Sequence, residues 1–318
     1  MKINFDEIYN EIDKNELEDS WKEIGASKRK ALLIAFIILV IVGVFFECVL
    51  FINNLENEIS FIDLIILPIM LGVIALFTLP ITYALAGSKS RAQYGGIYKK
   101  TIINKMISNF FSNVQYNPYE GLNKSIYDEG LYNEYYNIYD SEDHVEAVID
   151  NKNALRFAEV HTIHEDEYIN SRKGSGAARV TKFYGMFAQI DINSNINAPI
   201  RIRPNKLVRR KNDVELDSSE FEKIFDVESE DRIKAIQYLT HEVMEELVRF
   251  YEILGKNFDI YITKEHIYIR LHIGAIFDTA VSKKEVINKK KAEEYFNILQ
   301  FFYNFSKRMI AISEDNKF

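Results

Sequence analysis

The sequence predicts an α+β protein: an N-terminal two-helix transmembrane hairpin, followed by a cytoplasmic domain with an antiparallel sheet and packed helices. Three observations predict this fold class. Two long apolar runs lie near the N-terminus, segments with strand-like alternation follow from Val145, and helical patterns gather after them. Successive strands followed by helices are typical of α+β domains.

The composition narrows the classes of function. The chain has 318 residues, enough for one or two domains, and a formal net charge of −8. That charge argues against general nucleic-acid binding, so no DNA partner is expected. The single cysteine, Cys48, excludes an intrachain disulfide and fits a reducing compartment.

Residues 1–30 are predicted to form a cytoplasmic amphipathic helix. Phe5, Ile8, Ile12 and Ile24 lie on or near one stripe at helical spacing. The other face is rich in Asp and Glu, whereas a helix that lies in the membrane interface is usually basic. We therefore expect this helix to pack on protein.

Residues 31–87 are predicted to form a transmembrane helical hairpin. The runs 31-ALLIAFIILVIVGVFFECVLF-51 and 64-LIILPIMLGVIALFTLPITYALAG-87 both have the ~20 residues that are needed to cross the hydrocarbon core of a bilayer. The first run begins too late and is too long for a cleaved signal peptide, and a second run follows it.

The charges beside these runs predict their orientation. Basic residues precede the first run in 27-SKRK-30 and follow the second run between residues 89 and 100. The connecting loop has Glu56 and Glu58 but no Lys or Arg. By the positive-inside rule, both termini lie in the cytoplasm. We therefore expect a multi-pass protein of the cell inner (cytoplasmic) membrane, with residues 88–318 as its cytoplasmic α+β domain.

The first half of this domain is expected to contain a helix and four strands. The helix, at about 95–113, leads out of the membrane. The Tyr-rich stretch 125-SIYDEGLYNEYYNIYD-140 is interpreted as half-buried core with wet hydroxyls, and a binding surface is the alternative. Strands are expected at 145–149, 155–163, 179–192 and 199–203, with a hairpin turn at 173-KGSGA-177.

The second half combines helices with a hairpin. Helices are expected at 230–239, 241–254 and about 283–310, and strands at 258–262 and 266–273. Alternation in the last strand predicts one buried face and one solvated face. The buried face would carry Ile267, Ile269, Leu271 and Ile273, and the solvated face would carry His266, Tyr268, Arg270 and His272.

Five short motifs follow the two predicted spans in a characteristic order. They are 118-PYEGL-122, 155-LRFAEVH-161, 183-FYGMF-187, 221-FEKIFDV-227 and 236-IQYLTHEVMEEL-247. Their order and spacing resemble an uncharacterised bacterial membrane family, domain of unknown function family 3137, from the hairpin to roughly residue 280. The family has no established activity, so the resemblance implies an architecture and no catalytic residues. It also implies a LemA-type membrane protein as a partner, since relatives are often encoded near such proteins.

The stretch 239-LTHEVMEELVRF-250 contains His-Glu-x-x-Glu, close to the His-Glu-x-x-His helix of zinc hydrolases. A zinc hydrolase needs a second histidine where Glu245 stands. Thr240 is a good N-cap, which makes His241 and Glu242 the first two helical residues, and an acid in the first turn is favoured by the helix dipole. The motif is therefore interpreted as a helix start.

A second metal hypothesis joins 161-HTIH-164 to His241 or Glu245. In a regular strand His161 and His164 point to opposite faces, so a shared metal would need a bend. The chain has no G-x-S-x-G, and no cysteine outside the predicted spans. We therefore predict no catalytic, metal-binding or cofactor-binding residues and no cofactor, and we favour a protein that is not an enzyme.

A basic cluster stands out in 201-RIRPNKLVRRK-211. A solvated loop is the plainer explanation, contact with anionic headgroups or an acidic partner is the functional hypothesis, and RNA binding is a third alternative. The basic residues are Arg201, Arg203, Lys206, Arg209, Arg210 and Lys211.

These observations favour a membrane-anchored, non-catalytic interaction or scaffold protein, whose cytoplasmic domain binds a protein partner or the inner leaflet. The alternative is a membrane-tethered enzyme or small-ligand sensor, in which the Tyr-rich stretch and the polar sheet face line a pocket. A deep pocket with convergent polar groups would favour that alternative.

Overall fold

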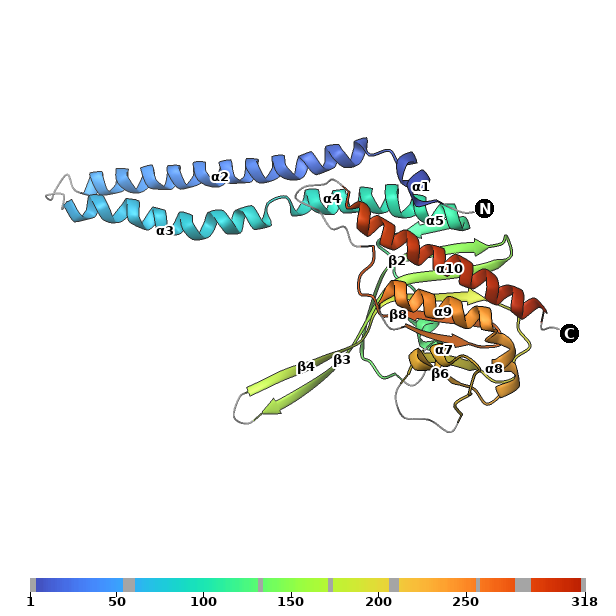
Figure 1. The fold of residues 1–318 in the computed structure, drawn as a ribbon. Coiled ribbons are helices and arrows are strands. Elements are labelled where there is room, and N and C mark those ends of the chain that lie inside the picture. The colour runs from blue at the N-terminus through green and yellow to red at the C-terminus, as the bar shows by residue number, and fades with distance from the viewer. Residues whose placement is uncertain are drawn as a thin grey trace. The chain divides into compact units, whose positions relative to one another are not determined.

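The chain forms two compact units. The computed structural model describes residues 4–53, 61–130, 134–170, 174–205, 212–255, 258–277 and 287–315. The α+β unit comprises Met1–Ile12, Lys99–Ala280 and Asn288–Phe318, and the helical unit comprises Asp13–Tyr98 and Val281–Ile287. These divisions differ from the expected boundaries at residues 30 and 87. Figure 1 shows the elements of each unit.

The described residues of the helical unit form three helices. They are α2 (Asn15–Asn53), α3 (Phe61–Leu85) and α4 (Ser88–Tyr98). Helix α2 packs along both α3 and α4. It runs without a break from a polar N-terminal part through residues 31–51, so the polar and apolar parts share one helix.

The single helix expected over residues 1–30 is instead divided in two. Helix α1 (Phe5–Glu11) ends at Ile12, whose backbone is extended. Asp13 then accepts a hydrogen bond from the backbone N–H of Asn15 at 3.0 Å. An Asp side chain that bonds the backbone two residues on is a local turn, and it separates α1 from α2.

The α+β unit contains an eight-stranded sheet in the order β1-β2-β3-β4-β8-β7-β5-β6, and every neighbouring pair is antiparallel. The predicted strands are confirmed, whereas β1 and β6 at the two edges were not predicted. The strands are β1 (Ser112–Asn117), β2 (Ile138–Ile149), β3 (Asn153–Asn170), β4 (Gly174–Asp191), β5 (Ile200–Pro204), β6 (Phe225–Glu228), β7 (Phe258–Ile262) and β8 (His266–Leu271).

Strands β3 and β4 form a hairpin that extends beyond its neighbours, as Figure 1 shows. Strand β2 pairs with β3 only as far as Ile163, and β8 pairs with β4 only from Met186 onward. The outer part, up to Asn170 opposite Gly174, pairs only within the hairpin. Residues 174–177, expected in the turn, belong to β4, because glycine and small residues also adopt extended conformations.

Helices complete the α+β unit. Helices α9 (His241–Leu254) and α10 (Lys289–Asp315) pack on one face of the sheet through aromatic rings. Phe258 of β7 contacts Phe250 and Phe301, and Phe157 of β3 contacts Phe302. The unit also contains η1 (Lys99–Ile103, a π-helix), α5 (Asn104–Phe110), α6 (Lys124–Glu129), α7 (Ser219–Ile224) and α8 (Arg232–Tyr238).

The other face of the sheet is also covered, by α6 and the Tyr-rich stretch. Tyr127 is fully buried against Phe183 and Phe187 of β4, in a cluster that includes Tyr268. A Cβ on Gly130 would lie 2.8 Å from the rings of Phe187 and Tyr268, so the end of α6 fits here only because that residue is glycine. The core interpretation of the Tyr-rich stretch is confirmed, with Tyr127 fully buried and Tyr136 and Tyr139 half-buried, whereas Tyr135 is exposed.

The prediction of a solvated face on β8 was therefore wrong for two of its four residues. Tyr268 and Arg270 are buried, at 3% and 6% exposure, and His266 and His272 are half-buried. The Arg270 guanidinium donates to Glu134 at 2.6 Å and to Asp259 at 3.0 Å. The covering segment is more than 100 residues away in the sequence, so strand alternation alone could not reveal it.

Candidate functional site

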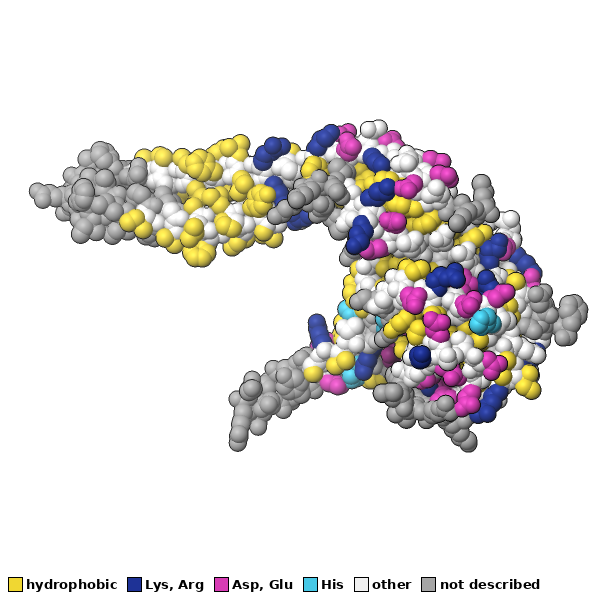
Figure 2. All heavy atoms as spheres, viewed as in Figure 1, with side chains coloured by type: hydrophobic (Ala, Val, Ile, Leu, Met, Phe, Trp, Pro, Cys, Tyr) yellow, Lys and Arg dark blue, Asp and Glu magenta, His cyan; other side chains and the backbone are white. Residues whose placement is uncertain are grey.

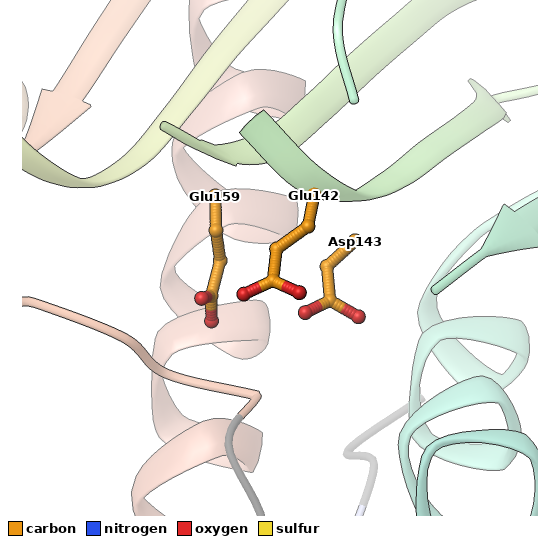
Figure 3. A group of neighbouring side chains, drawn as sticks. All are labelled: Glu142, Asp143 and Glu159. Carbon is orange, nitrogen blue, oxygen red and sulfur yellow. The ribbon is translucent and has the colours of Figure 1, made fainter. Parts of the chain in front are cut away.

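A buried charge cluster lies where η1, β1, β2 and β3 meet. We define it as Lys99, Tyr116, Glu142, Asp143 and Glu159. Figure 3 shows its three acidic side chains, which extend from β2 and β3 in the same direction. One carboxylate oxygen from each of the three lies within 4.8 Å of the other two.

A β-bulge turns Asp143 into the interior. The register of β2 against β3 shifts between Glu142 and Val145, and Asp143 has a φ of 58°. Bulges of this kind re-aim a side chain. The Asp143 carboxylate is fully buried, and it accepts hydrogen bonds from the Lys99 ammonium at 2.6 Å and from the Tyr116 hydroxyl.

Glu159 occupies a position that strand alternation assigns to the core. It follows Leu155 and Phe157 on one face of β3 and is 3% exposed. Its Oε1 accepts the backbone N–H groups of Ile276 at 2.6 Å and Phe277 at 2.5 Å, which ties the loop after β8 to the sheet. Burial raises the pKa of Glu159 to about 7, and the neighbouring Asp143 adds to the rise.

The other members of the cluster respond to the same surroundings. Burial alone would lower the pKa of Lys99, but the hydrogen bond and charge of Asp143 outweigh it and the pKa is raised. Burial also raises the pKa of Tyr116, and the Asp143 charge acts in the same direction. Lys99 and Tyr116 therefore stay protonated near neutral pH.

The cluster can hold a proton near neutrality. Both oxygens of Asp143 and one oxygen of Glu159 already accept hydrogen bonds from the protein, and Lys99 supplies a cation. A metal ion at these three acids would have to replace those donors, so the geometry gives a metal little support. The cluster was not predicted from the sequence. Its one visible signal was Glu159, an acidic residue on the same strand face as the apolar Leu155 and Phe157.

Two hollows on the described part of the α+β unit bear on function. One, of about 740 Å³, lies between α9 and α10 and has a polar, charged lining. The other lies against the sheet face beneath Gly130 and has a volume of about 10 Å³, the lower limit for one water molecule. The α9–α10 hollow is lined by Glu242, Glu245, Glu246, Arg249, Tyr303, Asn304, Lys307 and Arg308.

The His-Glu-x-x-Glu motif begins a helix, as predicted. The Thr240 side chain accepts a hydrogen bond from the backbone N–H of Val243, and α9 starts at His241. His241 lies 3.3 Å from Glu245, and both side chains are well exposed. Glu242 pairs with Arg308 at 2.6 Å instead of facing His241.

His161 and His164 have separate neighbours. The His161 ring lies against Tyr184, with 4.6 Å between ring centroids. His164 lies 2.9 Å from the carboxylate of Asp166. A register shift between Thr162 and Ile163 interrupts the regular alternation that we had assumed.

The basic cluster at 201–211 divides into two parts. Arg203 is buried and donates to Glu228 at 2.9 Å and to Asp213 at 3.2 Å, so its positive charge is balanced within the α+β unit. Arg201 is half-buried, and burial lowers its pKa. Lys206, Arg209, Arg210 and Lys211 lie outside the described residues, and their contact with an anionic surface stays a prediction.

The helical unit exposes a large apolar surface, visible in Figure 2 as the yellow area over α2 and α3. One helical run among the described residues, Gly72–Phe110, is long and apolar enough to cross a membrane. The exposed apolar side chains are Leu33, Ile34, Phe36, Ile37, Ile38, Val40, Ile41, Val42, Val44 and Phe45 in α2, and Ile69, Val73, Ile74, Leu76, Phe77, Ile81, Tyr83 and Leu85 in α3.

Comparison with known proteins gives one family and one structure. The model of the family described as "Protein of unknown function (DUF3137)" matches residues 181–309. The match begins within β4 and ends in α10, so the motifs at 118–122 and 155–161 lie outside it. No curated protein matches.

The solved structure is that of the mycobacterial trehalose monomycolate transport factor A, TtfA. It is similar with a TM-score of 0.35 and 8% identity, covering 67% of this chain and 94% of that chain. Similarity at this level carries no argument. The family match confirms the resemblance over residues 181–309, where the chain is similar to the DUF3137 family of unknown function.

Proposed function

We propose that this chain is an integral protein of the inner membrane, in which α2 and α3 both cross the bilayer and anchor the α+β unit in the cytoplasm as an interaction domain. The observation that carries the proposal is the apolar surface of α2 and α3. Water-soluble monomers rarely expose contiguous apolar patches larger than a few hundred Å². Moving one large apolar side chain out of water contributes ~1.5–3 kcal/mol, and each of the two helices offers many.

The α9–α10 hollow is the surface that we propose for a protein partner. Small-ligand pockets are mostly apolar with a few polar groups, whereas this hollow is lined throughout by polar and charged side chains. Three of them are acidic and three are basic, a mixture suited to a partner with both charges. A LemA-type membrane protein is the partner that the family resemblance suggests.

The alternative, a membrane-tethered enzyme or small-ligand sensor, predicted a pocket between the Tyr-rich stretch and the polar sheet face. These two surfaces pack together, and the cavity left between them has room for one water molecule at most. The α9–α10 hollow is wide enough for a small ligand. In the alternative function, this hollow would therefore be the ligand site.

Two experiments test the proposal. Alkaline carbonate should leave the full chain in the membrane pellet, and release into the supernatant would contradict anchoring by α2 and α3. A protein should then co-purify in stoichiometric amount from native membranes in mild detergent.

A charge-reversed variant tests the partner surface. Changing Arg249 and Lys307 to Glu should release the partner, whereas changing the exposed Lys223 and Lys264 to Glu, away from the hollow, should not. Co-purification of a stoichiometric small molecule in place of a protein would favour the alternative function.

A further inference from the structure

Five basic side chains gather where the apolar surface of the helical unit begins. Lys28, Arg29 and Lys30 lie on α2, and Lys89 and Arg91 lie on α4. We call these five residues the basic collar. In Figure 2 dark blue side chains lie at the end of the yellow area on α2 and α3.

The collar is held together by contacts between α2 and α4. The hydroxyls of Ser27 and Ser90 are 2.9 Å apart, which places the two basic segments side by side. Gly87, with a φ of 79°, allows the chain to turn close to α2: a Cβ there would lie 3.4 Å from the carbonyl oxygen of Ile24 and 3.5 Å from Lys28. Both basic segments therefore belong to one surface.

Two members of the collar are fixed in position. The Arg91 guanidinium donates to the carbonyl oxygens of Ala84 at 3.2 Å and Ala86 at 3.4 Å, at the end of α3. The Lys28 ammonium lies 4.7 Å from the centre of the Tyr83 ring. Neither contact neutralises a charge, so both side chains keep a full positive charge at the surface.

No carboxylate pairs with the collar among the described residues. Residues 24–46 and 64–119 contain no Asp or Glu, in a chain that has 47 of them. The buried cations of the α+β unit, by contrast, are paired: Lys99 with Asp143, and Arg270 with Glu134. The acidic residues are thus absent from the part of the sequence where five cations meet.

We propose that the basic collar binds the phosphate oxygens of anionic phospholipids at the point where α2 and α3 enter the bilayer. Ammonium and guanidinium groups form strong hydrogen bonds with phosphate, and an anionic leaflet attracts basic residues beside a membrane helix. The rest of the chain is acidic, and an anionic leaflet repels it, so the collar supplies the attraction. The inference rests on the membrane anchoring proposed above.

The test uses the only tryptophan, Trp21, as a donor of fluorescence energy. It lies on α2 seven residues before Lys28, or ~10 Å at ~1.5 Å per residue. The purified full chain is placed in lipid nanodiscs that contain a trace of pyrene-labelled phosphatidylglycerol, which is anionic, or pyrene-labelled phosphatidylcholine, which is neutral. Transfer to the anionic probe should be at least about twofold greater at low salt, and 1 M salt should remove the difference.

Two variants that each lose four charges identify the residues responsible. Changing Lys28, Arg29, Lys30 and Lys89 to Gln should abolish the preference for the anionic probe. Changing Lys152, Lys223, Lys264 and Lys290 to Gln, all exposed on the α+β unit, should leave it intact. Equal melting temperatures of the parent and both variants check the fold.

The outcomes separate this inference from the proposed anchoring. Equal transfer to both probes from a chain that stays in the nanodisc would overturn the collar and leave the anchoring intact. A preference that survives in the collar variant would also overturn it. A chain that fails to stay with the nanodisc would contradict the anchoring itself.

Discussion

Replacement of Glu159 by Gln should make the protein more stable at alkaline pH and remove part of the pH dependence of its stability. Burial raises the pKa of Glu159 from its ordinary value of 4.5 to about 7. The folded state thus binds a proton more tightly than the unfolded state between these two pH values. The free energy of unfolding therefore falls as the pH rises through this window.

The size of the effect follows from the shift. At ~1.4 kcal/mol per pKa unit, ionised Glu159 costs ~3 kcal/mol above pH 7, as an order of magnitude. The amide of the introduced glutamine keeps an oxygen that can accept the N–H groups of Ile276 and Phe277, and it carries no charge. At pH 8 the Glu159→Gln variant should gain ~2–3 kcal/mol, or ~4–10 °C in melting temperature. Near pH 5 parent and variant should melt at nearly the same temperature.

The assay is thermal unfolding of the full chain in mild detergent from pH 5 to pH 8.5, and the quantity compared is the difference between variant and parent. Other titrating groups, such as His144, whose pKa burial lowers, cancel in that difference. Glu142→Gln is the matched control, because Glu142 belongs to the same cluster but its side chain is 53% exposed. A Glu159→Gln difference that does not change with pH would refute the account of this cluster.

Three further substitutions test the packing, and a fourth tests the metal hypothesis, each by melting temperature. A Cβ on Gly185 would lie 1.8 Å from the carbonyl oxygen of Leu271, so Gly185→Ala should cost about 3 kcal/mol, and a neutral result would contradict the close approach of β4 and β8. Thr240→Ala should cost ~1 kcal/mol through the lost N-cap. Arg203→Ala should cost ~3–5 kcal/mol, because it removes the buried guanidinium that pairs with the carboxylates of Asp213 and Glu228. His241→Ala should change stability by less than ~0.5 kcal/mol, and zinc content should stay near zero in parent and variant.

Local signals gave reliable predictions. Helix α9 was predicted at its observed bounds, because both ends are encoded locally: Thr240 caps the N-terminus, and Gly255 adopts the left-handed conformation at the C-terminus. The apolar runs in α2 and α3 and the alternating strands are equally local patterns. The short motifs predicted the similarity to DUF3137 but indicated no chemistry.

The remaining features depend on contacts between distant parts of the chain. Arg270 was expected in solvent, yet Glu134, 136 residues away, pairs with it and the Tyr-rich stretch covers it. Glu159 is held by the backbone of Ile276 and Phe277, more than 100 residues further on. Asp143 turns inward at a bulge that no alternation pattern reveals. For this reason the sequence offered a signal for Glu159 alone and none for its partners in the charge cluster.

The most direct test of the account measures the membrane topology of helices α2 and α3. Cys48 is the only cysteine, so Cys48→Ser gives a background without thiols. Single cysteines are then placed at Asn54, between α2 and α3, and at Lys223, exposed on α7. In sealed right-side-out vesicles, a membrane-impermeant maleimide should label Asn54→Cys at once and Lys223→Cys only after lysis. Labelling of both positions, or of Lys223→Cys alone, in sealed vesicles would contradict a bilayer-spanning pair with a cytoplasmic α+β unit.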